Sequence, residues 1–218
     1  MTVPVIAIDG PSASGKGTVA QQVALAAGFH YLDSGALYRL VALEAINTGV
    51  SLSDEKLLGR LAETLNARFE GDEIWLSETP VTEDIRSEIC SLAASRVAAL
   101  PAVRSVLLAR QRAFRKIPGL VADGRDMGSV VFPDATLKVY LTATPEARAE
   151  RRYKQLKGKG IAARLSVLLQ DLRERDARDA SRSVAPLRQG PDARLLDTTA
   201  LTAEQAARQV LEWYRAPG

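Results

Sequence analysis

The stretch Gly10-Pro11-Ser12-Ala13-Ser14-Gly15-Lys16-Gly17-Thr18 decides how this chain folds. It follows Val3–Ile8, a continuous apolar run that is typical of a buried parallel strand. A helix is predicted to follow it, from Gly15 to about Ala27. A glycine-rich loop between a buried strand and a helix start is the context that the phosphate-loop motif requires, because backbone N–H groups and the helix dipole there bind phosphate. The sequence therefore predicts a nucleoside triphosphate site over residues 10–18, called the phosphate loop below.

Two side chains of the phosphate loop carry separate tasks. Lys16 can reach the β- and γ-phosphates, and the hydroxyl of Thr18 can support Mg²⁺. The plain motif has Ser or Thr directly after the lysine, whereas Gly17 intervenes here. The ending Gly-Lys-Gly-Thr resembles that of small-molecule nucleotide kinases more than that of GTPases or ATPase motors. The Asn-Lys-x-Asp element that reads guanine is also absent from the sequence.

The rest of the chain alternates between strand and helix patterns. Four further short apolar strands are predicted, at 29–32, 119–123, 137–142 and 193–196. Helices are predicted at 36–48, 54–66, 84–99, 102–116, 145–157, 161–179 and 202–215. This alternation predicts an α/β fold of three layers, with a five-stranded parallel sheet covered on both faces.

One segment departs from the alternation. Residues 67–70 and 73–76 read as two strands joined by a tight turn at Gly71-Asp72, with a possible third strand at 80–82. The pattern predicts a small antiparallel β insertion between helices.

Composition narrows the class of protein. A length of 218 residues predicts one domain. The chain has one cysteine, Cys90, which excludes an internal disulfide framework and a cysteine zinc site. It has one histidine, His30, so no second histidine is available beside a Ser-His-Asp or Cys-His site. No apolar run approaches the roughly 18 residues that a bilayer crossing needs. We therefore expect a soluble, cytoplasmic protein that does not bind membranes.

Charge is unevenly placed along the chain. The net charge is only +3, but residues 51–88 hold ten acidic and four basic side chains, and residues 148–182 hold eleven basic and five acidic ones. The basic segment lacks a recognisable nucleic-acid-binding motif, and a compact basic segment can equally close over a small anionic ligand. We expect no nucleic-acid partner.

Three further motifs indicate a second, smaller anionic substrate. Residues 32–39 end a predicted strand, with Ser34 near a helix N-terminus and Arg39 about one turn into that helix. Residues 122–128 end the third predicted strand, where open parallel sheets bind their ligands. Residues 175–182 follow the basic helix and alternate arginine with aspartate.

Together these motifs resemble the bacterial cytidylate kinase family, a member of the nucleoside monophosphate kinase group. The Asp-Gly-Arg-Asp-Met-Gly run with the flanking Val-Val-Phe-Pro-Asp is the part specific to this family. The matching stretches are Ile8–Thr18, Leu32–Arg39, Ala94–Arg115, Pro118–Asp134 and Glu174–Pro186. The resemblance implies transfer of the γ-phosphate of ATP to CMP or dCMP by a monomer, with Mg²⁺ accompanying the ATP.

The resemblance also implies a role for individual residues. Lys16, Arg125 and Arg182 would be catalytic, with Gly10, Pro11, Ser12, Ala13, Ser14, Gly15, Gly17 and Thr18 completing the ATP site. The phosphate and sugar of the monophosphate would be bound by Ser34, Arg39, Arg125 and Arg182, and the ribose hydroxyls by Asp179. Cytosine would be recognised by Ser95, Arg104 and Asp126.

The same resemblance suggests three parts within the domain. A core would comprise about 1–35, 100–147 and 183–218, and a monophosphate-binding region with the β insertion about 36–99. A basic helical lid over about 148–165 would bring Arg148, Arg151, Arg152 and Arg164 to the triphosphate. Two alternatives stay open from the residues alone: a kinase for another small acceptor such as UMP, and a non-catalytic or nucleic-acid-associated ATP-binding module.

Overall fold

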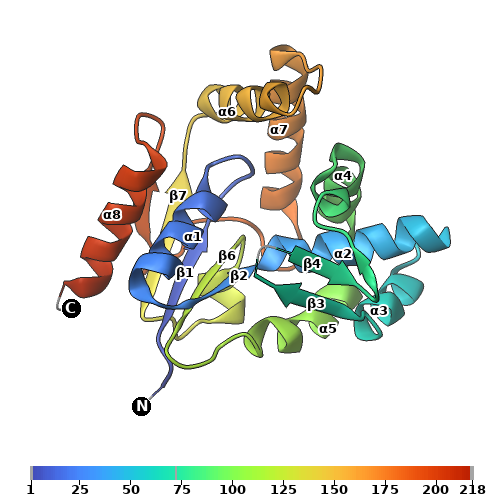
Figure 1. The fold of residues 1–218 in the computed structure, drawn as a ribbon, viewed down its shortest axis with the longest axis horizontal. Coiled ribbons are helices and arrows are strands. Elements are labelled where there is room, and N and C mark those ends of the chain that lie inside the picture. Colours follow the sequence, from blue (N-terminus) through green and yellow to red (C-terminus); the bar gives the residue numbers. More distant parts are fainter. Residues whose placement is uncertain (1, 72, 217–218) are drawn as a thin grey trace. The chain divides into compact units, whose positions relative to one another are not determined.

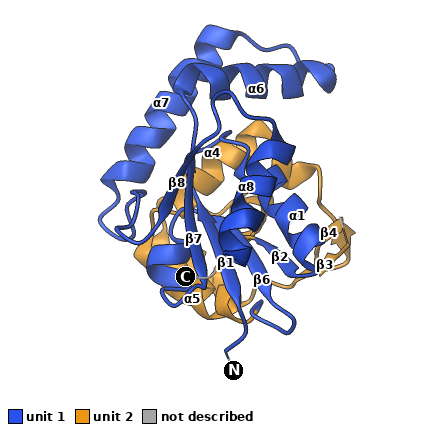
Figure 2. Cartoon of the chain, turned by 90° about the vertical axis from the view of Figure 1, so that its left-hand side faces the viewer, with its two compact units in different colours: residues 1–32, 114–218 blue, residues 33–113 orange. Residues whose placement is uncertain are grey.

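The structure is a computed structural model that describes residues 2–71 and 73–216. The chain forms two compact units, one of residues 1–32 and 114–218 and the other of residues 33–113 (Figure 2). Each unit is described by itself below.

The first unit is built on a five-stranded sheet whose strand order is β2-β6-β1-β7-β8 (Figure 1). The pairs of β1 with β6, β1 with β7 and β7 with β8 are parallel, which confirms the predicted α/β class. The strands are β1 (Val5–Asp9), β2 (His30–Asp33), β6 (Leu120–Gly124), β7 (Leu137–Thr142) and β8 (Arg194–Asp197).

Two helices cover one face of this sheet. They are α1 (Lys16–Ala27) and α8 (Ala203–Arg215), and each contributes a short row of small side chains to the core. Val23 of α1 and Val210 of α8 pack in one cluster with Ile6 and Ile8 of β1. A capping box between Thr202 and Gln205 fixes the start of α8.

The carboxyl ends of the strands define one edge of the sheet. In the register of the parallel pairs, Asp9 lies opposite Gly124 on one side and opposite Tyr140 on the other. The loops that follow β1, β6 and β7 therefore leave the sheet side by side, which is where open parallel sheets bind ligands. One turn of π-helix, η2 (Met127–Val131), follows β6. The helices α6 (Pro145–Gly158) and α7 (Leu165–Ser181) follow β7 and pack against each other.

The second unit consists of helices and a small sheet. Its helices are α2 (Ser34–Thr48), α3 (Glu55–Glu63), α4 (Glu88–Val97) and α5 (Pro101–Arg112). The sheet is antiparallel and comprises β3 (Ala67–Glu70), β4 (Glu73–Leu76) and β5 (Thr79–Pro80), which confirms the predicted insertion. Asp72, the second residue of the predicted turn, lies outside the described residues. Within this unit α2 packs on α4, and α3 packs on α5.

Several element boundaries differ from the predictions. The single helix expected over 84–99 is a 3-10 turn, η1 (Asp84–Arg86), followed by α4. The break has a local cause, because Ser87 is extended (ψ 155°) and its hydroxyl accepts a hydrogen bond from Cys90 N at 3.2 Å, which starts a new helix. The helix expected to reach residue 66 ends at Glu63, since the carbonyl of Asn66 pairs with Ser77 N beside the hairpin.

The two units cut across the parts expected from the sequence. Helix α5, expected in the core segment that starts at about 100, belongs to the second unit, which extends to Ala113. The segment 148–165, expected as a lid, lies in the first unit. Its role as a lid stays a prediction.

No single helix of the described chain is long and apolar enough to cross a membrane. Only α4 and α5 taken together satisfy the length and composition criteria, and they are bent by 101° at their junction.

Candidate active site

The phosphate loop joins β1 to α1, as the sequence predicts. Gly10 packs so closely on β7 that a Cβ there would lie 2.0 Å from the carbonyl oxygen of Leu141, so only glycine fits. Gly15 caps α1 in the left-handed conformation (φ +92°), and Ala13 is also left-handed (φ +57°). Such alternation makes successive backbone amides converge on one point, which is the geometry of an anion site.

Arginines from α6 hold two carbonyl groups of the phosphate loop. Arg148 Nη1 donates to the carbonyl oxygen of Ser12 at 3.1 Å, and Arg151 Nη1 donates to that of Ser14 at 2.9 Å. In a trans peptide the carbonyl and the following N–H point in opposite directions. The amides that follow Ser12 and Ser14 therefore point away from α6 and can donate to a bound anion.

Polar side chains of the loop also fit a phosphate ligand. The Ser14 hydroxyl is buried and has no hydrogen-bond partner in the part of the chain that the structure describes. A buried hydroxyl left unpaired costs about 1–3 kcal/mol, and a phosphate oxygen would pair it. Lys16 Nζ folds back over the loop and donates to the Pro11 carbonyl oxygen at 3.3 Å.

A cluster of two arginines and one aspartate adjoins the loop. Arg125, directly after β6, donates from Nη2 to the Ser12 hydroxyl and from Nε to Asp179 Oδ2, both at 2.8 Å. Arg182 pairs with the other oxygen of Asp179. The structure thus brings together three residues that the sequence predicts for one substrate, and joins them to the phosphate loop.

The charge state of Asp179 follows from these neighbours. Its side chain is 1% exposed, and burial alone would favour the neutral acid. The positive charges of Arg125 and Arg182 and the hydrogen bond from Arg125 outweigh burial, and they lower the pKa of Asp179. Asp179 therefore stays ionised and holds both guanidinium groups in place.

Asp126 follows Arg125 and is 3% exposed at the start of η2. The amides after it are bound by another residue, because Met127 N and Gly128 N each donate to the carboxylate of Asp9 at 2.8 Å. Burial raises the pKa of Asp9 to about 7.

The four basic residues expected in a lid do not form one group. Arg148 is 3% exposed and pairs with Asp176 of α7, with Nη2 at 2.5 Å from Oδ2. Arg151 reaches the phosphate loop, Arg152 donates to Gln155 within α6, and Arg164 stands at the start of α7. Arg148 is thus buried beside the phosphate loop, because α7 supplies a carboxylate for it. Its approach to the triphosphate on lid closure stays a prediction.

The other residues expected to bind the monophosphate belong to the second unit. Asp33 caps α2 by accepting a hydrogen bond from Ala36 N at 3.1 Å, and it also pairs with Arg39. The cap leaves Ser34, 3% exposed, in the first turn of the helix. Arg39 is therefore held one turn further along α2, as the sequence predicts.

Ser95 and Arg104 are both buried in this unit, at 3% and 7% exposure. Arg104 Nη1 donates to the Ala98 carbonyl oxygen at 3.1 Å, and its guanidinium lies 5.9 Å from the centre of the Tyr38 ring. The Ser95 hydroxyl has no hydrogen-bond partner among the described residues. A buried hydroxyl with no partner among the described residues is consistent with a binding site for a polar ligand.

A divalent cation would find few protein ligands here. Among the described residues no three His, Cys, Asp or Glu side chains are grouped so as to hold a metal ion. Mg²⁺ in nucleotide sites uses mainly phosphate and water oxygens, with one or two protein ligands. Thr18 in the first turn of α1 and Asp123 fit that need, since Asp123 Oδ2 lies 3.5 Å from the position that a Cβ on Gly17 would take.

Sequence reasoning assigned no role to several residues of this site. Asp176 supports Arg148, and the Thr198 hydroxyl lies 3.1 Å from the carbonyl oxygen of Ser14. Asp9 is the last residue of β1, and its place at a strand end is the signal that could have indicated it. Asp123 lies one residue before the end of β6, in the run that the family resemblance singled out.

A phosphate loop at the carboxyl edge of a parallel sheet, with a cluster of arginines beside it, defines a phosphoryl-transfer enzyme that uses a nucleoside triphosphate. The sequence model of one family, described as cytidylate kinase, matches residues 6–216. The chain belongs to the cytidylate kinase family and is a kinase.

Individual relatives agree with this assignment. A cytidylate kinase from Chromobacterium violaceum is 62% identical over 214 residues, which cover 98% of this chain and 96% of the relative. One from Polynucleobacter asymbioticus is 58% identical, covering 98% of this chain and 97% of the relative. Among solved structures, a gluconokinase from Sinorhizobium meliloti is similar in fold, with a TM-score of 0.50 at 17% identity, covering 97% of this chain and 91% of that one.

The Asp179 cluster gives a first testable prediction. Replacing Asp179→Asn leaves the largely buried guanidinium groups of Arg125 and Arg182 without their carboxylate, and should lower the free energy of unfolding at pH 7 by about 3–5 kcal/mol. Because the pKa of Asp179 is lower in the folded chain than in the unfolded one, its stabilisation is present above about pH 4 and is lost as the pH falls through the folded pKa. The difference between wild type and variant should therefore shrink at low pH.

Urea unfolding from pH 7 down to pH 3 measures this difference. The matched control is Asp171→Asn, an exposed aspartate on the same helix, which should behave like wild type. If the difference in free energy of unfolding between wild type and Asp179→Asn stays constant over this range, the ion-pair assignment is contradicted.

Proposed function

We propose that this kinase transfers the γ-phosphoryl group of ATP to CMP or dCMP, giving ADP and CDP or dCDP. The observation that supports this most directly is the Arg125 guanidinium, which is shared between Ser12 of the phosphate loop and Asp179 of α7. That position can neutralise a phosphoryl group on its way from donor to acceptor. The membership of the cytidylate kinase family supplies the identity of the acceptor.

On the donor side, the phosphate loop would bind the phosphates of ATP through backbone amides and Lys16. Mg²⁺ would be held by Thr18 and, through water, by Asp123. When bound, the cation neutralises the phosphates and fixes their geometry. Arg148 and Arg151 would act by keeping the amides of the loop turned toward the anion.

On the acceptor side, the roles follow the family pattern. Arg125 and Arg182 would bind the phosphate of CMP, and Asp179 would accept hydrogen bonds from the ribose. Asp126 would accept from the cytosine amino group. Within the second unit, the residues assigned to CMP are Ser34, Arg39, Ser95 and Arg104.

The reaction needs no dedicated base. The second pKa of a phosphomonoester is near 6, so the attacking oxygen is already largely deprotonated at neutral pH. The enzyme has to align the two substrates, neutralise the transferring group and exclude water. Arginine suits this work because its planar guanidinium binds phosphate oxygens in pairs.

The remaining expectations concern setting and partners. A kinase for UMP and a non-catalytic ATP-binding module are not favoured by the family match. A cytoplasmic monomer without nucleic-acid or membrane partners stays a prediction.

Lys16 tests the donor side. Lys16→Ala should lower kcat/KM by roughly 100- to 1000-fold, the loss typical when one preorganised charge at such a site is removed. The melting temperature should change little, because the hydrogen bond from Lys16 to the Pro11 carbonyl oxygen lies within the phosphate loop itself. Lys116→Ala, an exposed lysine on a connecting segment, is the control. Wild-type turnover by Lys16→Ala would exclude the phosphate-loop assignment.

Asp126 tests the acceptor. ADP release should depend on CMP or dCMP and be on the order of a hundredfold less efficient with UMP, because the carbonyl of uracil faces the Asp126 carboxylate where cytosine has an amino group. Asp126→Ala should lower kcat/KM for CMP much more than for UMP and leave the KM for ATP unchanged. Equal losses with both acceptors would contradict the base assignment, and turnover independent of any acceptor would contradict the proposed function.

The lid is also open to experiment. We propose that residues 148–165 close over ATP, with Arg152 and Arg164 as the movable cations, since Gly158 and Gly160 interrupt the helices there and a Cβ at either would meet nothing within 4 Å. Closure would exclude the water that hydrolyses ATP. Amide hydrogen exchange over this segment should slow when both substrates, or a two-headed analogue, are bound, while exchange in α8 should not. Unchanged exchange at saturation would exclude a lid.

A further inference from the structure

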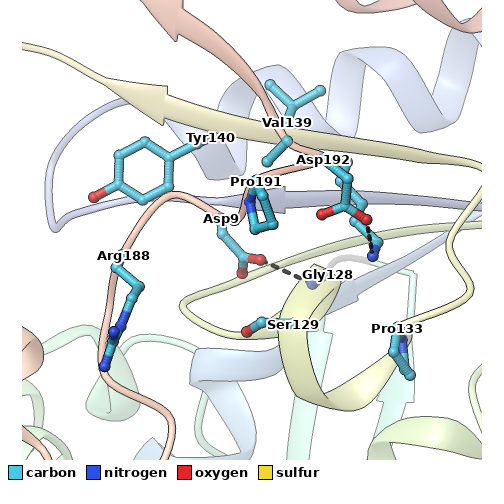
Figure 3. A pocket seen from close by; sticks show the side chains of 12 residues that line it. Asp9, Gly128, Ser129, Pro133, Val139, Tyr140, Arg188, Pro191 and Asp192 are labelled. Carbon is cyan, nitrogen blue, oxygen red and sulfur yellow. Dashed lines mark hydrogen bonds and ion pairs between the residues drawn. The ribbon is translucent and has the colours of Figure 1, made fainter.

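Asp9 is the last residue of β1, directly before the phosphate loop, and its side chain is directed to another loop. Both oxygens of its carboxylate are used, since Oδ1 accepts from Met127 N and Oδ2 from Gly128 N, each at 2.8 Å. Asp9 is 9% exposed and lies 118 positions before Met127 in the chain. Figure 3 shows its carboxylate with the hydrogen bond to Gly128.

These two amides are the first of η2, and helix starts need an acceptor. An aspartate that precedes a helix normally supplies it by accepting from amides of its own first turn. Asp126 occupies that position, but its side chain makes no cap hydrogen bond. The cap comes instead from Asp9, on a different element.

We propose that Asp9 is a positioning residue for base recognition: it caps η2 from β1 and so keeps the Asp126 carboxylate out of the cap and turned to the base of the acceptor. Asp9 does not touch the substrate and acts through Asp126. The inference rests on the proposed function, in which Asp126 accepts from the cytosine amino group.

Asp9 also lines a cavity of about 220 Å³, through which water and protons can reach it. Charged and titratable groups face it from three directions. They are Arg125 and Asp126 on the loop after β6, Lys138 and Tyr140 on β7, and Arg188 and Asp192 on the segment before β8. Lys138 is paired with Asp192 at 2.5 Å, and burial raises the pKa of Tyr140, which keeps its hydroxyl neutral.

The capping of η2 therefore depends on the protonation state of Asp9. Burial, with a smaller contribution from Asp126, raises the pKa of Asp9 to about 7, despite the two backbone hydrogen bonds. A protonated carboxyl has one oxygen that carries hydrogen and accepts poorly, so it caps only one of the two amides. Positioning should weaken as the pH falls below about 7.

The substitution Asp9→Asn tests the proposal because it keeps the shape but offers one acceptor and a donor group. The side-chain NH2 of the asparagine would face one of the two backbone N–H groups, so that N–H group would lose its hydrogen bond. We expect kcat/KM for CMP to fall while that for UMP changes little, so that the CMP to UMP ratio narrows at least tenfold. The KM for ATP should stay within twofold of wild type.

The matched control is Asp192→Asn, the same change on the other aspartate of the cavity, whose carboxylate pairs with Lys138 of β7. It should keep the wild-type ratio. In the wild type, the ratio of kcat/KM for CMP to that for UMP should fall from pH 8 to pH 6. In Asp9→Asn this ratio should not depend on pH. The ratio is measured because the phosphate groups of CMP and UMP titrate alike, so their effect on kcat/KM cancels when one is divided by the other.

The outcomes separate this inference from the proposed function. An Asp9→Asn variant that folds and keeps the wild-type ratio within twofold overturns the positioning role, even if Asp126→Ala behaves as expected. If Asp9→Asn does not fold, the amide resonances of Met127 and Gly128 in the wild type decide. Their chemical shifts should change together between pH 6 and 8, over the same pH range as the ratio of kcat/KM for CMP to that for UMP. Chemical shifts that stay constant over this range would overturn the proposal. Absence of CMP turnover in the wild type would instead refute the proposed function.

Discussion

Two carboxylates, one turn apart on α7, hold the arginines on which the rest of this site depends. Asp176 pairs with Arg148, and Asp179 pairs with Arg125 and Arg182. Positions three apart on a helix lie on the same face, so both carboxylates meet the end of the sheet together. A site for several phosphates needs many cations in a small volume, and those cations repel one another before the substrate arrives. The aspartates remove that repulsion and fix the guanidinium groups in directions that a flexible side chain would not hold.

This arrangement links the phosphate loop to elements distant in the sequence. Arg148 connects Ser12 of the loop to α7, and Arg125 connects the same residue to the end of β6. Ser12 therefore receives one arginine at its carbonyl and another at its hydroxyl. Because the directions of the loop amides depend on its carbonyls, the anion site is shaped by α6 and α7 as much as by its own glycines.

The sequence predicted much of the fold, since hydrophobic runs and glycines act locally. The five parallel strands, the antiparallel insertion and the phosphate loop all followed from short patterns, and so did the helix start at Pro101. The break at Ser87 was missed because one serine hydroxyl, rather than a change in hydrophobic pattern, ends one element and starts the next.

The site was predictable only where a motif marks it. Arg125, Asp179 and Arg182 stand in recognisable runs, and the structure brings them together. Arg148 stands in a run of basic residues that predicted a lid, and its partner Asp176 lies 28 positions away. No periodicity shows that Arg148 is buried against Asp176 while Arg151 and Arg152 stay partly exposed. Thr198 is 184 positions from Ser14, and its contact with the phosphate loop depends entirely on the pairing of β8 with β7.

Asp9 and Asp179 show how the surroundings of one side-chain type decide its use. Both carboxyls are buried and both accept two hydrogen bonds, yet their pKa values shift in opposite directions. Asp179 faces two guanidinium groups, whose full charges outweigh the cost of burial. Asp9 accepts from two neutral amides and has the carboxylate of Asp126 nearby, so the cost of burial prevails. An aspartate that holds cations is thus kept ionised at neutral pH, while one that holds a backbone turn has a pKa close to neutral pH. The contribution of Asp179 to the free energy of unfolding falls as the pH is lowered, because the folded chain releases the Asp179 proton more readily than the unfolded chain does. The contribution of Asp9 rises as the pH is lowered, because the folded chain holds that proton more tightly. The buried carboxylate of Asp9 costs stability at neutral pH, and it stands where it caps the turn that begins at Asp126.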